Sequence, residues 1–139
     1  MSRTERLLTT GHGFRTDTAG DDWSLLLDLH PNLLVIGSTA ATEAFIQALV
    51  PHVRSPVQSL MGGALPPELP SDGTLILRDV DILEGDQQER LLRWLGEPRS
   101  GHPQVVSLTT AALYSRVQAG MFSDRLYYRL NVVHFRLVC

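Results

Sequence analysis

The sequence predicts an α/β fold, a three-layer sandwich in which helices cover both faces of a short, mostly parallel β-sheet. Short runs of apolar residues alternate along the chain with segments of helical periodicity, and glycine, serine or threonine stands at the junctions. Apolar runs without polar alternation are typical of strands that are buried on both faces. Strands that alternate with helices favour a parallel sheet with helices on either side.

The composition is that of one globular domain. The chain has 139 residues, enough for one domain with one hydrophobic core. Hydrophobic residues make up 43% of it and charged residues 19%, an ordinary balance that argues against disorder. The formal net charge of -3 argues against direct nucleic-acid binding, because phosphate contacts require a concentrated basic face.

Several classes of protein and site are disfavoured by what the sequence lacks. No apolar run approaches the roughly 20 residues that span a bilayer, and Met1 to Thr10 has no signal-peptide stretch, so we expect a cytoplasmic protein without a membrane partner. The single cysteine, Cys139, excludes an internal disulfide. The five histidines show no HxH or HxxxH spacing, so we expect no metal site.

The beginning of the chain predicts an arm followed by a single domain. Residues 1–21 are polar and carry three glycines, so we expect a loosely attached N-terminal arm, and residues 22–139 form the domain. The first elements of the domain are a helix over Trp23–Leu29, a buried strand over Leu33–Ile36 and, after a glycine turn, a helix over Ala41–Val50.

The remaining elements follow the same alternation. The segment from His52 to Asp72 is rich in proline and glycine, which predicts a loop with one poor strand near Val57. Thr109 or Thr110 is expected to cap one later helix, and Ser123 the next. The later strands are predicted over Thr74–Leu77, Val105–Leu108 and Val132–Leu137, and the later helices over Asp86–Leu95, Ala111–Ala119 and Asp124–Leu130.

The second half of the chain resembles a known family. In order, it reads GTLILRD, QQERLLRWLGE, VVSLTTAAL, QAGMF and SDRLYYRLNVV. These segments are similar to those of the AAA+ ATPase domain of sigma-54-dependent transcription activators, and LYYRLNV is the most specific of them. The first half matches through NLLVIGSTAATEAF, at the strand and phosphate loop. The resemblance implies an AAA+, P-loop-like core, truncated before the helical lid of the family.

The phosphate loop of the family corresponds here to GSTAATEA. An active loop directs backbone N–H groups at the phosphates, and its lysine supplies positive charge. The position of that lysine holds Glu43, whose carboxylate would repel a triphosphate. The resemblance therefore implies a degenerate loop, and we favour a capped helix start that packs on a strand. The degenerate loop comprises Gly37, Ser38, Thr39, Thr42 and Glu43.

The two acids of the Walker B motif correspond to Arg78 and Asp79. An active domain needs one acid to hold magnesium and a second to polarise the attacking water. A cation stands where the magnesium-holding acid belongs, so the resemblance implies no hydrolysis. We expect Arg78 to pair with Asp79, Asp81 or Glu43. A pair with Glu43 would fill the space that lysine, magnesium and phosphate occupy in an active domain.

Two further catalytic positions differ from the family, and one is kept. Thr110 stands at the sensor asparagine, where we favour a helix-capping role, and Ser123 stands at the first trans-acting arginine. Arg129 matches the second trans-acting arginine. It is either an exposed helical arginine, or one bonded to Asp124 or Asp81, or a finger offered to a neighbouring active subunit.

Candidate contact residues lie on the same predicted helix. Tyr127 and Tyr128 are adjacent, so at most one faces inward, and the other adds exposed aromatic surface of the kind enriched at interfaces. With Arg129 they are the interaction candidates. The segment from Glu43 to Gly73 is about half the family's length and lacks the sigma-contacting GAFTGA loop.

Together these features predict a protein that is not an enzyme and needs no cofactor. We expect a regulatory or protein-interaction module whose partner is a sigma-54-type activator or a second copy of itself. The alternative is a domain that binds a nucleotide or another anion, without hydrolysis, in a modified phosphate-loop pocket.

Overall fold

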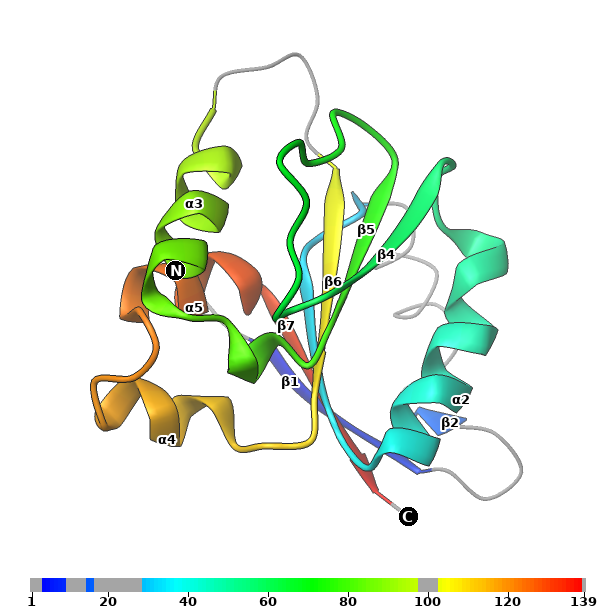
Figure 1. Cartoon of the computed structure of the whole chain (residues 1–139). Coiled ribbons are helices and arrows are strands. Elements are labelled where there is room, and N and C mark those ends of the chain that lie inside the picture. Colours follow the sequence, from blue (N-terminus) through cyan, green and yellow to red (C-terminus); the bar gives the residue numbers. More distant parts are fainter. Residues whose placement is uncertain (1–3, 10–14, 17–28, 98–102, 139) are drawn as a thin grey trace.

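The computed structural model of the chain describes residues 4–9, 15–16, 29–97 and 103–138 (Figure 1). The helix predicted over Trp23–Leu29 lies, apart from its last residue, outside the described residues. The described part forms a three-layer α/β structure, as the alternation of apolar runs and helical segments predicts.

The central layer is a seven-stranded sheet in the order β2-β1-β7-β3-β6-β5-β4. All neighbouring strands are parallel except β1 and β2, which are antiparallel. The strands are β1 (Thr4–Thr9), β2 (Arg15–Thr16), β3 (Leu33–Ile36), β4 (Val57–Met61), β5 (Thr74–Arg78), β6 (Gln104–Thr109) and β7 (Val133–Val138).

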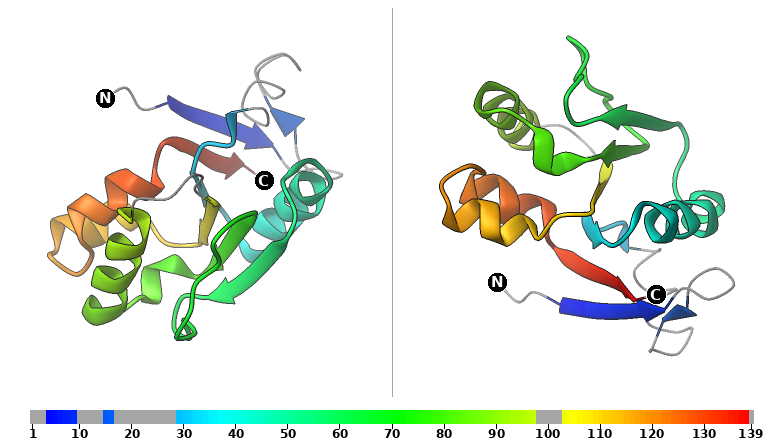
Figure 2. Two further views of the ribbon diagram at one scale, coloured as in Figure 1. Left: turned by 90° about the horizontal axis from the view of Figure 1, so that it is seen from above. Right: turned by 60° about the horizontal axis from the view of Figure 1, so that its bottom comes forward.

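Helices cover both faces of this sheet (Figures 1 and 2). Helix α2 packs on one face, and α3, α4 and α5 pack on the other. Two short 3-10 helices, η1 and η2, follow α2 and β5. The helical elements are α2 (Thr39–Leu49), η1 (Val50–His52), η2 (Val80–Ile82), α3 (Gly85–Leu95), α4 (Leu113–Gln118) and α5 (Asp124–Leu130).

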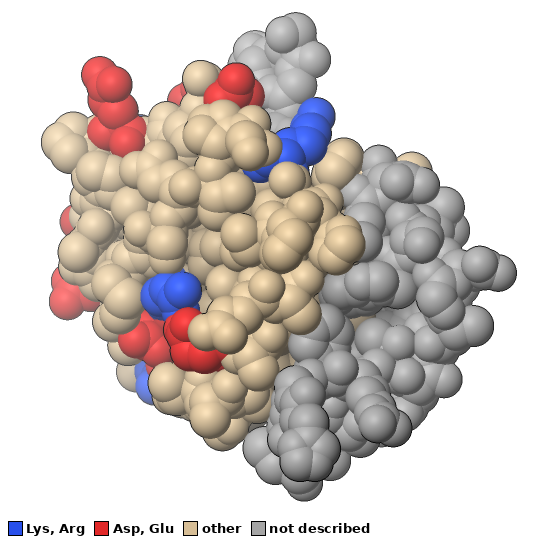
Figure 3. All heavy atoms as spheres, turned by 90° about the vertical axis from the view of Figure 1, so that its right-hand side faces the viewer, with Lys and Arg blue, Asp and Glu red and all other residues tan. Residues whose placement is uncertain are grey.

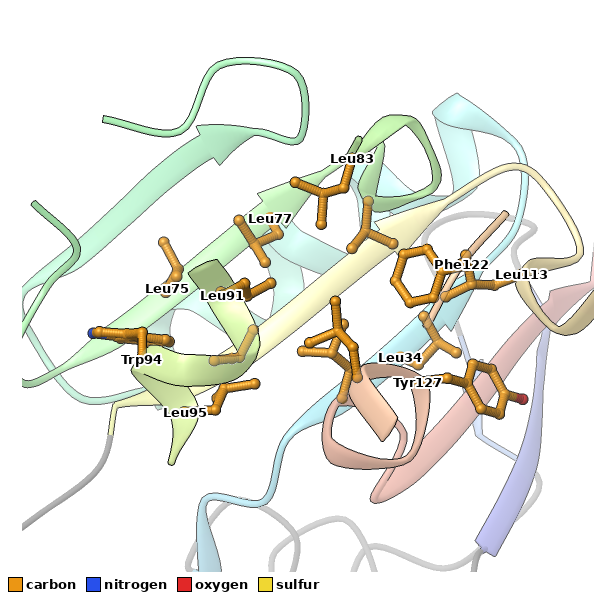
Figure 4. Close-up of a cluster of buried hydrophobic side chains, with 14 residues drawn as sticks. Leu34, Leu75, Leu77, Leu83, Leu91, Trp94, Leu95, Leu113, Phe122 and Tyr127 are labelled. Atoms are coloured by element: carbon orange, nitrogen blue, oxygen red, sulfur yellow. The ribbon is translucent and has the colours of Figure 1, made fainter. Parts of the chain in front are cut away.

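Each face of the sheet has its own hydrophobic core, because successive side chains of a strand point to opposite faces. Within β3, Leu34 faces α3 and α5, whereas Leu33 and Val35 face α2. The larger cluster is shown in Figure 4 and fills the space under the three helices. Its labelled members are Leu34, Leu75, Leu77, Leu83, Leu91, Trp94, Leu95, Leu113, Phe122 and Tyr127.

The four buried strands predicted from apolar runs are present within one or two residues of their predicted bounds, and β4 lies at the poor strand predicted near Val57. The strand β1 was not predicted, because residues 1–21 were expected to form a loosely attached arm. Instead, Thr4 to Thr9 pairs along its length with β7, from Val133 to Val138. Its sequence, TERLLT, lacks the apolar run that marks the central strands. The boundary between arm and domain stays a prediction.

Two predicted helix starts differ from the structure by two residues, and the first is that of α2, which begins at Thr39 and not at Ala41. The helix expected from Ala111 begins two residues later as α4, and its N-cap is Ala112, without a side-chain hydrogen bond. Neither Thr109 nor Thr110 caps it. Thr109 is the buried last residue of β6, and its hydroxyl donates a hydrogen bond to Asp81 at 2.7 Å. The same hydroxyl accepts a hydrogen bond from the N–H of Ala111 at 3.0 Å, so it holds the turn before α4 and not the start of the helix itself.

The second capping prediction is confirmed. The hydroxyl of Ser123 accepts a hydrogen bond from the backbone N–H of Leu126 at 3.2 Å, and α5 begins and ends where it was predicted. Such a cap satisfies one of the free N–H groups at a helix start. The Ser123 position therefore has a structural role in starting α5.

Candidate functional site

A cleft of about 230 Å³ opens where β3, β5 and β6 end. In open α/β sheets, ligands bind beyond the carboxyl ends of the strands, so this is the expected place for a site. Five of the seven residues predicted for the phosphate loop and Walker B motif line it, and Gly37 and Ser38 do not. The lining residues are Thr39, Thr42, Glu43, Met61, Arg78, Asp79, Leu108, Thr109 and Thr110.

The segment in the phosphate-loop position is the first turn of α2, not an open loop. Ser38 is the N-cap, and its hydroxyl accepts a hydrogen bond from the N–H of Ala41 at 3.1 Å. Its carbonyl accepts another from the N–H of Thr42 at 2.9 Å. A phosphate loop works by leaving such N–H groups free for an anion. Here the helix cap and the first helical bond engage both groups.

Gly37 is held by packing. Its N–H donates to the carbonyl of Thr109 at 3.1 Å, which joins the end of β3 to the end of β6. A Cβ atom at this position would lie 2.8 Å from the Cβ of Leu137 on β7. Real Cβ atoms do not approach one another so closely. Close packing against Leu137 therefore explains why glycine stands at this phosphate-loop position, without a role in phosphate binding.

Arg78 and Glu43 form a salt bridge across the cleft, between Nη1 of the guanidinium and Oε1 of the carboxylate. This contact was one of three predicted for Arg78. The guanidinium also donates through Nε to the hydroxyl of Ser59 on β4 at 3.0 Å. The two side chains are 29% and 42% exposed, so the bridge lies at the mouth of the cleft. It links α2, β5 and β4.

The side of the molecule that carries α2 has few charged side chains. Figure 3 shows mostly uncharged atoms there, with acidic and basic side chains in small adjacent groups. Charges of opposite sign that lie side by side cancel each other's field at a distance. The described residues on this side therefore form no concentrated basic surface of the kind that attracts a polyphosphate.

The turn after β5 has a constrained backbone at Asp79, the position of the second Walker B acid. Asp79 adopts a left-handed conformation, with φ 52° and ψ 51°. The N–H of Gly62 donates to the carbonyl of Arg78 at 2.7 Å, and a Cβ on Gly62 would meet the carbonyl oxygen of Asp79 at 2.3 Å. Aspartate is one of the residues that tolerate this conformation. Close packing against Gly62 thus accompanies the unusual backbone at Asp79.

Sequence reasoning missed a polar cluster beside the cleft. Asp81 was considered as a partner of Arg78 or Arg129, but its carboxylate accepts the hydroxyl hydrogen bond from Thr109 and lies 3.9 Å from a guanidinium nitrogen of Arg116. The Asp81 side chain is only 11% exposed. The cluster ties η2 to β6 and α4. Only the fold brings these residues together, so no local sequence signal could have identified it.

The three interaction candidates on α5 lie away from the cleft and differ in exposure. Tyr127 is 3% exposed, and its ring centroid is 5.4 Å from that of Tyr114. Tyr128 is 42% exposed, and Arg129 is exposed as well. Within the described ranges, no ion pair joins Arg129 to Asp124 or Asp81. As predicted, only one of the two tyrosines faces inward, so Tyr127 cannot act as a surface contact.

No cluster of three or more histidine, cysteine, aspartate or glutamate side chains in the described part of the chain is arranged to hold a metal ion. None of the described helices has the length and apolar character needed to cross a membrane.

Residues 32–138 match the family described as the sigma-54 interaction domain. The chain belongs to this family. The match covers the structure from the residue before β3 to the end of β7, and it leaves β1 and β2 outside. The chain is therefore a domain of the AAA+ ATPase family of transcription regulators, and it derives from the ATPase domain of sigma-54 activators.

A relative with a similar sequence is the DNA-binding transcriptional regulator NtrC of Rhizobium meliloti (strain 1021). The two are 39% identical over 75 residues, which cover 47% of this chain and 16% of NtrC. The chain thus corresponds to a small part of that protein.

Solved structures show the same fold. NtrX from Brucella abortus, in complex with ADP, superimposes with a TM-score of 0.63 at 19% sequence identity, over 84% of this chain and 35% of NtrX. The P-loop NTPase domain of a sigma-54 transport activator from E. coli has a TM-score of 0.58 at 14% identity, over 85% of this chain and 96% of that domain. The five central parallel strands, β7-β3-β6-β5-β4, therefore form a P-loop NTPase-like sheet.

Proposed function

We propose that this chain is a non-hydrolysing member of the sigma-54 interaction domain family, and that it acts as a regulatory or protein-interaction module. The observation that carries the proposal is the Arg78–Glu43 salt bridge at the mouth of the cleft. In an active domain this space holds a lysine, a magnesium ion and the nucleotide phosphates. Here an internal ion pair satisfies the charges that a metal-bound nucleotide would otherwise meet.

Among the described residues that line the cleft, Arg78 is the only cation, and there is no lysine. All 12 of its lysine and arginine residues are arginines. The arginine in the cleft, Arg78, stands in the position of a metal-holding acid, and its guanidinium would repel magnesium. The carboxylate of Glu43, in turn, would repel phosphate. Both charges are thus opposite to those that ATP hydrolysis needs.

The helix start supports the proposal independently of charge. Because Ser38 engages the N–H groups of Ala41 and Thr42, these two amides are not free to bind a phosphate. Ser123, in the position of a trans-acting arginine, caps α5 instead. Binding would therefore require both a reversal of charge and the opening of the first turn of α2.

We further propose that the chain acts in the cytoplasm by binding a protein partner. This partner is a sigma-54-type activator or a second copy of the chain. The segment from Glu43 to Gly73, where the family carries its sigma-contacting loop, is about half the family's length and lacks the GAFTGA motif. We therefore propose that the chain does not remodel a sigma-factor complex itself. It would instead modulate an activator by occupying a subunit position.

Titration calorimetry with ATP and ADP, with and without magnesium, tests the absence of nucleotide binding. Phosphate release tests hydrolysis in the same samples. We expect no heat of binding at micromolar to millimolar nucleotide and no phosphate release above the buffer rate. Saturable ATP binding with turnover would overturn the proposal. A pull-down from the native cell then tests the partner, and recovery of a sigma-54-type activator would support the regulatory role.

The alternative function is binding of a nucleotide or another anion without hydrolysis. It is favoured by the cleft that remains, about 230 Å³, with Thr39, Thr42, Thr110 and Arg78 in its lining. A thermal-shift screen with GTP and cyclic dinucleotides, beside ATP and ADP, distinguishes the two functions. A ligand that stabilises the wild type but not the Arg78→Gln variant would favour this alternative.

A further inference from the structure

Strand β4 leaves one edge of the sheet open. It is the last strand in the sheet order and pairs with β5 on its inner side. Figure 2 shows it at the outer margin of the sheet, with no described strand beyond it. Natural edge strands are protected by charged residues, prolines or bulges. The residues of β4, VQSLM, include no charge and no proline, and Val57 and Met61 are 37% and 44% exposed.

The hydrogen bonds to β5 define which backbone groups of β4 point outward. Thr74 donates its N–H to the carbonyl of Pro56 at 2.9 Å, and Gly62 donates its N–H to the carbonyl of Arg78 at 2.7 Å. In a parallel ladder, alternate residues of a strand bond to the same neighbour. The even-numbered residues of β4 therefore bond inward, and the odd-numbered residues present their N–H and C=O groups to the open edge. The outward residues are Val57, Ser59 and Met61.

We propose that this edge binds a second copy of the chain, through antiparallel pairing of the two β4 strands about a two-fold axis at Ser59. Two identical strands related by a two-fold axis run antiparallel, and the contact is self-complementary. With the axis at Ser59, Val57 lies opposite Met61 of the second copy, and Ser59 lies opposite its own counterpart. Each outward residue then both donates and accepts, as in the hydrogen-bonded pairs of an antiparallel ladder.

The side chains fit the same register. Val57 and Met61 lie on one face of β4, so each exposed apolar side chain would cover the other across the axis. On the opposite face, Gln58 would meet Leu60, and no like charges would face each other within the strands. Beyond the strand ends, Pro56 would lie opposite Gly62, which has no side chain to obstruct the approach.

This inference rests on the proposed function in one respect, since both require a protein partner. It identifies that partner as a second copy of the chain and the contact surface as β4. The edge adjoins the nucleotide cleft, since Met61 lines the cleft and the Ser59 hydroxyl accepts a hydrogen bond from Arg78, but the contact is made by backbone groups of β4 and requires no nucleotide. A failure to dimerise would leave the nucleotide titrations unchanged, and ATP turnover would overturn the non-hydrolysing role without affecting the edge contact. The two proposals can therefore fail separately.

Disulfide trapping tests the register. In a hydrogen-bonded antiparallel pair the Cα atoms lie about 5.5 Å apart, within the range that a disulfide spans. In a background with Cys139→Ser, the Ser59→Cys variant should form a covalent dimer on mild oxidation. Gln58→Cys is the matched control, since position 58 would face position 60 of the second copy. Equal cross-linking at both positions, or none at Ser59→Cys, would overturn the register.

Light scattering during size-exclusion chromatography tests the association itself. The full-length chain should shift from monomer to dimer with rising concentration. Val57→Lys places an ammonium group against Met61 of the second copy at two symmetric positions, and should weaken the dimer roughly ten-fold. Gln47→Lys, exposed on α2 and away from the edge, should leave it unchanged. A monomer at all concentrations, or a dimer indifferent to a folded Val57→Lys variant, would contradict the proposal.

Discussion

The salt bridge between Arg78 at the end of β5 and Glu43 on α2 joins two residues that lie 35 positions apart in the sequence. Each stands where the family resemblance places a group of opposite charge. Either charge without the other would stand unmatched at the mouth of the cleft, and the bridge pairs them.

The bridge should contribute little to folding stability. Both side chains are partly exposed, and exposed ion pairs contribute about 0.2–1 kcal/mol. A double-mutant cycle with Glu43→Gln and Arg78→Gln should give a coupling free energy in that range, measured by urea denaturation. The cycle should also shrink at high salt. A coupling of several kcal/mol would mean that the pair is far better shielded from water than the structure shows.

Restoring the family charges should not restore catalysis. The variant Glu43→Lys/Arg78→Asp keeps an ion pair of reversed polarity, so we expect it to fold with a circular dichroism spectrum like that of the wild type. Ser38 still holds the first turn of α2 closed, so phosphate release should stay at the buffer rate. Turnover in this variant would show that charge alone, and not the helix start, prevents hydrolysis.

Gly37 should be intolerant of even one added methyl group. The Cβ of alanine would lie 2.8 Å from the Cβ of Leu137, and relief requires β3 and β7 to separate. Overpacking of this kind costs about 1–3 kcal/mol of unfolding free energy. The matched control is Gly85→Ala at the start of α3, where nothing lies within 4 Å and alanine favours the helix. Denaturant titration should therefore give shifts of opposite sign for the two variants.

Gly37 also illustrates what the sequence could predict and what it could not. The apolar run before it predicted β3, and its place after a strand matched a phosphate loop. The contact with Leu137 lies 100 positions along the chain, so local pattern could not reveal it. The same limit applies to Thr109, whose hydroxyl donates to Asp81, 28 positions away in the sequence. The assembled strands decide which hydrogen-bond partner such a polar side chain meets, and its neighbours in the sequence do not.

The charged positions were easier to predict than β1. Glu43 was one of three partners expected for Arg78, because two motif positions that adjoin in the family carry opposite charges here. By contrast, β1 has no buried-strand pattern, because it forms through backbone pairing with β7. Pairing of that kind leaves little trace in side-chain periodicity. The phosphate-loop match indicated a degenerate site, but only the three-dimensional structure shows that Ser38 caps the first turn of α2.

Gln88 should be the most sensitive polar residue of α3. It is 5% exposed, and its amide donates to the carbonyls of Leu83 at 2.9 Å and Met121 at 3.0 Å. Its oxygen accepts from the N–H of Ser123 at 2.7 Å. Gln88→Leu would leave three backbone groups without this partner and should cost about 2–3 kcal/mol in thermal or urea unfolding. Glu89→Ala, at the exposed neighbouring position, should change stability by less than about 0.5 kcal/mol.

Substitutions of the two adjacent tyrosines of α5 should distinguish an effect on folding stability from an effect on partner binding. Tyr127 is buried against Tyr114, so Tyr127→Ala should cost about 3–5 kcal/mol of unfolding free energy through the cavity that it creates. Tyr128 is 42% exposed, and Tyr128→Ala should cost less than about 1 kcal/mol. If α5 contributes to a protein contact, Tyr128→Ala and Arg129→Ala should weaken capture of the partner while their unfolding curves stay near that of the wild type. Capture that is lost only with Tyr127→Ala would report unfolding, and would exclude the exposed face of α5 as the contact surface.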